Sequence, residues 1–116
     1  MRTLIESWSG LKFWYGAINQ PDKILVVEFY SSRDQRCARL KPFLQDMSER
    51  YQDFAFLKVS IENDETFGLA DEYEIKRLPA IVIMNNSVVQ TKVEDATQTT
   101  ITEALEATKQ RMHRRI

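Results

Sequence analysis

The sequence predicts an α/β domain in which helices cover both faces of a mixed central sheet. The segments at residues 24–30 and 53–61 are nearly continuous apolar runs, as in strands buried on both faces. Segments with apolar residues at steps of three and four follow these runs, which indicates helices between the strands. Two more predicted strands, 80–84 and 88–93, are joined by an Asn-Asn-Ser turn and indicate an antiparallel hairpin. We therefore expect a mixed sheet of about four to five strands flanked by about four helices.

Local signals place the ends of the predicted elements. Ser9 is a typical N-cap for the first helix, and Pro21 disfavours helix at the residue before it. Asp95 and Gln98 have capping-box spacing at the start of the last helix. In chain order we expect a short strand or extended arm at 3–7, a helix at 9–19, a strand at 24–30, a helix at 36–51, a strand at 53–61, a helix at 63–73, strands at 80–84 and 88–93, and a helix at 95–111.

The composition is that of one soluble globular domain spanning residues 1–116, with 43% hydrophobic and 28% charged residues. A formal net charge of −1 gives no global field that would favour DNA or an anionic membrane. No apolar run reaches the roughly 20 residues of a membrane helix, and the N-terminus lacks the pattern of a signal peptide. The single cysteine fits a reducing compartment, so we expect a cytoplasmic protein. The sequence does not indicate an oligomeric state.

Metal and cofactor chemistry has no support in the sequence. One cysteine, Cys37, and one histidine, His113, are too few ligands for a zinc site. The chain has only three glycines and no glycine-rich phosphate loop. We therefore expect no metal and no cofactor.

The stretch from Ile24 to Phe43 carries the residues with distinctive chemistry. A strand ends at Tyr30, and the polar tetrad Asp34-Gln35-Arg36-Cys37 stands at the start of the following helix. The apolar positions of that helix then fall at steps of three and four: Cys37, Leu40, Leu44, Met47 and Tyr51. This is a strand–loop–helix unit with the only cysteine in the first turn of the helix.

A series of motifs, taken in order, resembles the thioredoxin family over nearly the whole chain, from about residue 5 to residue 109. The correspondences are Glu28 for the family's buried aspartate, Arg33–Cys37 for its Trp-Cys-Gly-Pro-Cys site, Lys41–Phe43 for its Lys-Pro-Phe helix kink, Lys58 for its strand lysine, and Ile75–Ala80 for its Ile-x-x-x-Pro-Thr segment. The resemblance implies the thioredoxin fold and a cis Leu78–Pro79 bond. The sequence departs from the family in having Arg36 for proline, and Ser87 and Asp95 for glycine.

The resemblance places Asp34 at the attacking-thiol position and Cys37 at the resolving-thiol position. Dithiol chemistry needs both thiols, one to attack as thiolate and one to resolve the mixed disulfide. A carboxylate cannot attack sulfur to form a disulfide. We therefore expect no dithiol–disulfide oxidoreductase activity within one chain. We expect Asp34 to cap the helix instead, by accepting hydrogen bonds from the first free N–H groups.

Two interpretations of Cys37 stay open at this point. The helix N-terminus, Arg33 and Arg36 favour a thiolate that could form mixed disulfides. The neighbouring Asp34 and the burial implied by the resemblance favour a neutral thiol that is simply part of the core.

Glu28 and Lys58 are expected to form a buried pair, because a charge inside a sheet is costly unless it is paired. The resemblance implies that Glu28 could move a proton for a thiol. Without a dithiol to serve, the pair could equally be a structural remnant.

The resemblance also implies a docking face for an extended peptide. Its candidate binding residues are Arg33, Asp34, Gln35, Arg36, Leu78 and Pro79. Arg77 adds a third arginine, and these cations fit either an acidic or phosphorylated partner or a solvated rim. The basic tail at 109–115 can complement a helix dipole or grip RNA or an acidic protein.

Function therefore has two hypotheses. The first is a non-catalytic protein-binding or scaffold domain that uses the loop around Asp34–Cys37 and Pro79. The alternative is a single-cysteine redox protein in cell redox homeostasis that forms mixed disulfides through Cys37.

Overall fold

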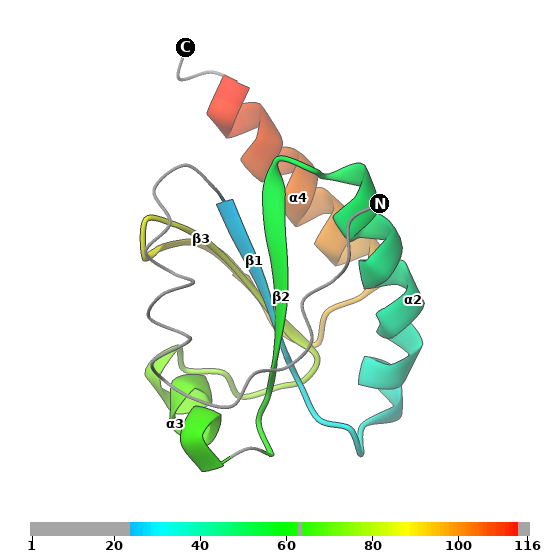
Figure 1. Ribbon diagram of the computed structural model, residues 1–116, viewed down its shortest axis with the longest axis vertical. Coiled ribbons are helices and arrows are strands. Elements are labelled where there is room, and N and C mark those ends of the chain that lie inside the picture. Colours follow the sequence, from blue (N-terminus) through cyan, green and yellow to red (C-terminus); the bar gives the residue numbers. More distant parts are fainter. Residues whose placement is uncertain (1–23, 63, 114–116) are drawn as a thin grey trace.

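A computed structural model describes residues 24–62 and 64–113, and all structural statements below concern these residues. Figure 1 shows a sheet with α2 and α4 on one side and α3 on the other. The elements in chain order are β1 (Ile24–Tyr30), α2 (Gln35–Arg50), β2 (Phe54–Ser60), α3 (Asp64–Glu72), β3 (Ala80–Asn85), β4 (Val88–Val93) and α4 (Gln98–His113). The predicted strand at 3–7 and helix at 9–19 lie outside the described residues.

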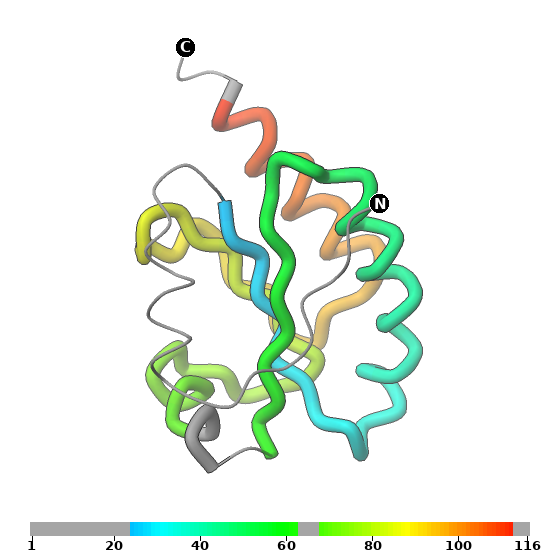
Figure 2. Tube along the Cα trace, viewed as in Figure 1, coloured from blue at the N-terminus to red at the C-terminus, as the bar shows by residue number. Residues whose placement is uncertain are grey.

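The strands form a mixed sheet in the order β2-β1-β3-β4, so the prediction of a mixed sheet is confirmed. β1 pairs with β2 in parallel and with β3 antiparallel, and β3 and β4 form the predicted hairpin. The hairpin turn has positive φ at Asn86 (52°) and Ser87 (68°), which matches the twist of the flanking strands. The path of the chain through these strands can be followed in Figure 2.

Each face of the sheet has its own hydrophobic core, which explains why β1 is apolar at nearly every position. Val26 points to the face covered by α2 and α4, and Val27 points to the face covered by α3; both are almost fully buried. The first core contains Leu40, Leu44 and Met47 of α2 with Ile101 and Leu105 of α4, and the second contains Leu69 of α3. β1 therefore lies inside the sheet, between β2 and β3. The residues that follow its C-terminal end emerge where the strands of the sheet end.

The predicted start of the last helix was wrong by three residues. α4 begins at Gln98 and not at Asp95, because Asp95 has a left-handed backbone with φ 51°. The capping box consists of Thr97 and Thr100, whose side chains and N–H groups bond each other reciprocally at 2.9 and 3.1 Å. Asp95 is thereby left outside the helix, and its side chain is available for another contact. No described helix has the length and apolar character needed to cross a bilayer.

Candidate functional site

The site begins at Asp34, which is the N-cap of α2. Its backbone is extended, and its Oδ1 accepts hydrogen bonds from the N–H of Arg36 at 2.8 Å and of Cys37 at 3.4 Å. These bonds satisfy two of the N–H groups that a helix start leaves without partners. The side-chain hydrogen bond from Arg36 is the main reason why the pKa of Asp34 lies below its ordinary value. Asp34 is therefore an ionised cap.

Arg36 joins Asp34 to a residue far away in the sequence. Its Nη2 lies 3.1 Å from Asp34 Oδ2, and its Nη1 lies 2.7 Å from Asp95 Oδ1. The guanidinium therefore uses two of its edges on two carboxylates, as the forked geometry of arginine allows. All three side chains are partly open to solvent, so the cluster lies at the surface of the site.

Cys37 lies beneath this charged cluster and is a free, buried thiol with 5% of its surface exposed. Burial raises the pKa of Cys37, and the negative charges of Asp34 and Glu28 raise it further. A backbone hydrogen bond at Ser31 and the charge of Arg36 act in the opposite direction but do not prevail. The sulfur is thus protonated at neutral pH and a poor nucleophile.

Glu28 and Lys58 are partners in the parallel β1–β2 register, and both are buried. Desolvation raises the pKa of Glu28 to about 7, while the charge of Lys58 opposes that rise. The Lys58 ammonium also lies 4.8 Å from the centre of the Tyr30 ring, a cation–π contact. Glu28 Oε2 is buried without a hydrogen-bond partner. The two residues are therefore register neighbours whose charges interact, and part of the Glu28 carboxyl group has no hydrogen bond.

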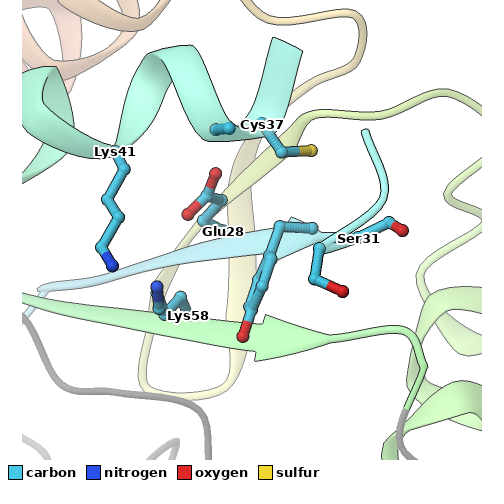
Figure 3. A pocket seen from close by; sticks show the side chains of 8 residues that line it. Glu28, Ser31, Cys37, Lys41 and Lys58 are labelled. Atoms are coloured by element: carbon cyan, nitrogen blue, oxygen red, sulfur yellow. The ribbon is translucent and has the colours of Figure 1, made fainter. Parts of the chain in front are cut away.

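A cavity of about 170 Å³ opens beside this pair. Figure 3 shows Lys41 of α2, Lys58 of β2 and Glu28 of β1 directed into the same space, with the sulfur of Cys37 pointing to the other side of Glu28. Ser31, Ser32, Tyr30 and Ala38 complete the lining. The cavity connects the titratable groups under the start of α2 with solvent.

The Leu78–Pro79 bond is cis and stands directly before β3. Ala80 pairs with Phe29 near the end of β1, so the proline lies at the sheet edge from which the Asp34 loop emerges. The Pro79 carbonyl accepts a hydrogen bond from the N–H of Ala96 at 2.9 Å. Ala96 follows Asp95, the partner of Arg36. The proline loop and the start of α2 are therefore connected through the segment after β4.

The remaining arginines differ in their surroundings. Arg33 is 91% exposed and lies 3.4 Å from Glu62, whose carboxylate also accepts hydrogen bonds from Ser32. Arg77 is exposed and takes part in no ion pair among the described residues. Gln35 is exposed on the first turn of α2. Two of the three arginines are thus charge-balanced by carboxylates of the same chain.

Two carboxylates of the site were not anticipated from the sequence. Glu94 accepts hydrogen bonds from the N–H groups of Lys76 and Arg77, and these bonds lower its pKa. Glu62 holds Ser32 and approaches Arg33, as described above. Both act between loops that lie far apart in the sequence, where no spacing rule gives a signal. Asp95 was predicted as a helix cap and noticed as a departure from glycine, but not as a partner of Arg36.

The chain is similar to known proteins both in sequence and in structure. Residues 11–107 match the family model described as Thioredoxin. Thioredoxin-2 of Saccharomyces cerevisiae is 27% identical over 89 residues, which is 77% of this chain and 84% of that protein. Chloroplastic thioredoxin F2 of Arabidopsis thaliana is 32% identical over 82% of this chain, and this chain spans about half (51%) of its length.

The solved structures that are similar to this chain also include thioredoxins. Thioredoxin F from spinach chloroplast, short form, superposes with a TM-score of 0.82 at 26% identity, covering 92% of this chain and 94% of that one. A chain from the complex of ferredoxin:thioredoxin reductase and thioredoxin f2 superposes with a TM-score of 0.80 at 28% identity, covering 92% and 96%.

Proposed function

This chain belongs to the thioredoxin family, and we propose that it binds an extended segment of a protein partner without dithiol chemistry. The proposed surface consists of Arg33, Asp34, Gln35, Arg36 and Leu78, with Pro79, which is itself buried, beneath it. One observation carries the proposal: the carboxylate of Asp34 caps α2 at the position where the resemblance places the attacking thiol. A site so altered keeps its shape and loses its nucleophile.

The main chain around Pro79 supports this role. Leu78 forms no main-chain hydrogen bond within the part of the chain that the structure describes. Its neighbours are held in place, because Glu94 binds the N–H groups of Lys76 and Arg77 and Ala96 binds the Pro79 carbonyl. A fixed loop with a free N–H and C=O can pair with an extended peptide, as in the addition of a strand to a sheet edge.

The charges of the surface favour recognition of the partner's main chain over a strongly acidic partner. Arg33 lies beside Glu62, and Arg36 is shared by Asp34 and Asp95. An acidic partner would have to displace these carboxylates to reach either guanidinium. Arg77 is the arginine best placed to meet a partner carboxylate. The similar chain in the reductase complex supports a protein partner in general.

The single-cysteine alternative has weaker support. Cys37 is among the residues that line the cavity, but its sulfur points to the other side of Glu28 (Figure 3). Its 5% exposure and raised pKa both slow the attack of its sulfur on a disulfide. We also propose a cytoplasmic location, on the ground that a single thiol stays reduced there.

Site-specific photo-crosslinking tests the proposal. A photoreactive amino acid is placed at Gln35 on the proposed surface, or at Val88 at the opposite end of the sheet; both side chains are exposed. The proposal predicts that a partner is captured from Gln35 and not from Val88. Capture that is equal at both positions, or stronger at Val88, contradicts it.

A further inference from the structure

Val88 and Val89 at the start of β4 are the exposed large hydrophobic residues of the described part of the chain, with 59% and 42% of their surfaces exposed. They are consecutive in a strand, so their side chains point to opposite faces of the sheet. Val89 pairs with Met84, which belongs to the core on the α3 side, and Val88 pairs with Asn85. A ligand on one face would cover one of these valines. A strand added beside β4 would place side chains next to both.

β4 is the last strand in the order β2-β1-β3-β4, so no described strand pairs with its outer edge. Alternate residues of such an edge direct their N–H and C=O groups outward, where an added strand can bind them. Gln90 Nε2 lies 3.4 Å from the Val88 carbonyl, a long contact that an incoming N–H can replace. The bulge at Gln90 and the charge of Lys92 interrupt the edge, and such features protect a strand from indiscriminate pairing. A short, matched segment therefore suits this edge.

A groove of about 260 Å³ lies on the α3 side of this edge. Its lining consists of three residues with apolar bodies and three with charges: Tyr73, Val82, Val89, Glu72, Glu74 and Lys92. Lys92 donates hydrogen bonds to the main-chain carbonyls of Tyr73 and Glu74, at 3.2 Å each, so its ammonium already binds the end of α3. Within the described ranges, neither Glu72 nor Glu74 forms an ion pair. The groove thus joins an apolar surface to two carboxylates.

These two carboxylates occupy positions that do not stabilise the helix. Glu72 is in the last turn of α3, which contains no basic residue, and a negative charge there is unfavourable beside the negative end of the helix dipole. The N–H groups of Glu74 and Ile75 close the helix in a Schellman motif. Glu74 has the left-handed backbone of that motif, with φ 55°, where glycine is usual. A cation in the groove would offset both costs.

We propose that the outer edge of β4 binds an extended segment of a partner protein in which lysine or arginine alternates with β-branched apolar residues. The aliphatic stem of a basic side chain packs along Val89 in the groove, and its charged end meets Glu72 and Glu74. The apolar residues of the segment point to the other face, beside Val88. A second copy of this chain fits less well, because antiparallel pairing of two β4 strands about a twofold axis brings two acidic grooves to the same face of one sheet.

This edge is a second surface, and the inference does not rest on the proposed docking function. Val88 pairs with Asn85 at the end of β3, whereas Leu78 and Pro79 stand before the start of that strand. In the crosslinking test above, the docking partner is the protein that Gln35 captures. A different protein captured only from Val88 would be a partner of this edge, so the two proposals can fail separately.

The test uses a short synthetic peptide of about six residues, the length of a typical strand, in which lysine and valine alternate. Its binding to the full, isotope-labelled chain is followed by amide NMR, beside a control peptide in which glutamate replaces each lysine. We expect saturable shifts at Val88, Val89 and Lys92 with the lysine peptide and none with the glutamate peptide. Methylation of alternate main-chain nitrogens in the lysine peptide removes donors to β4 and should weaken binding at least about tenfold.

Exchange of single carboxylates tests the groove. Glu72→Lys should weaken binding of the lysine peptide at least about tenfold, whereas Glu103→Lys makes the same charge change at an exposed position of α4 and should stay within about twofold of the wild type. Glu74→Gly should raise the urea midpoint, because the left-handed backbone suits glycine, and yet lower the affinity for the peptide. A residue that only stabilised the fold would not move these two quantities in opposite directions.

The proposal is overturned if the glutamate peptide binds as tightly as the lysine peptide, or if methylation leaves binding unchanged. It is also overturned if Glu103→Lys weakens binding as much as Glu72→Lys. A dimer of the chain that forms without peptide and disappears in Val88→Lys would assign the edge to a second copy and overturn it as well.

Discussion

Arg36 and Asp95 lie 59 residues apart in the sequence and are joined by a 2.7 Å ion pair that ties the start of α2 to the loop after β4. Arg36 also binds Asp34, so the three side chains form one cluster. By the resemblance, each of these positions differs from the family pattern: Asp34 from cysteine, Arg36 from proline and Asp95 from glycine. The three departures therefore form one interacting unit, and the altered site is a connected structure.

The backbone of Asp95 gives a first prediction. Its φ of 51° suits glycine, so Asp95→Gly relieves strain while it removes the ion pair, whereas Asp95→Ala removes the ion pair and keeps the strain. Asp95→Gly should be more stable than Asp95→Ala by about 1 kcal/mol, measured by urea unfolding. Equal stability of the two variants would show that the left-handed backbone carries no strain.

Glu28 makes the stability depend on pH. Its pKa rises from 4.5 in the unfolded chain to about 7 in the fold, so the folded state holds its proton more tightly. The stabilisation from this group is complete below pH 4.5 and is lost as the pH rises through 7, a difference of about 3 kcal/mol. Glu28→Gln cannot ionise, and it should be more stable than the wild type by about 1–3 kcal/mol at pH 8, with a much smaller gain at pH 5.

Urea unfolding at the two pH values measures this effect. Glu103→Gln, an exposed position on α4, controls for the loss of a negative charge alone. The pKa values of Asp34, Glu62 and Glu94 are lowered in the fold, so these groups act in the opposite direction and lose their stabilisation as the pH falls. A gain for Glu28→Gln that is the same at pH 5 and pH 8 would argue against a raised pKa of Glu28.

The Cys37 thiol should react slowly in the native protein. Burial and the raised pKa both reduce its attack on alkylating reagents, so labelling by iodoacetamide at pH 7.5 should be at least about tenfold slower than in urea. Asp34→Asn removes a neighbouring negative charge that raises the thiol pKa, and it should label faster than the wild type. If iodoacetamide labels Cys37 in the native protein as fast as in urea, the result would support the single-cysteine hypothesis.

Restoring the missing thiol tests whether only the nucleophile is absent. Asp34→Cys places a thiol at the start of α2, next to the guanidinium of Arg36, and both features favour a thiolate. We expect this variant to reduce insulin above the dithiothreitol background, while the wild type does not. Asp34→Cys combined with Cys37→Ser should stay inactive, because it lacks a resolving thiol. Insulin reduction by the wild type itself would contradict the loss of dithiol chemistry.

The sequence predicted the fold better than the site. The bounds of β1 and β4 were correct, because both strands are bordered by clear polar and turn residues. The start of α4 was missed, because Asp95 has the composition of a cap but adopts a left-handed backbone. The contacts of Arg36 with Asp95 and of Glu94 with Arg77 could not be predicted, because they depend on how loops distant in sequence meet.

The central claim is that this site binds a protein partner without using a thiol. The most direct measurement is the affinity of a partner captured from Gln35 for the wild type and for Cys37→Ser, each with and without dithiothreitol. The account predicts dissociation constants equal within about twofold in all four conditions, because Cys37 is buried and makes no contact with the partner. Binding that disappears in Cys37→Ser, or on addition of dithiothreitol, would contradict it and assign the interaction to a mixed disulfide.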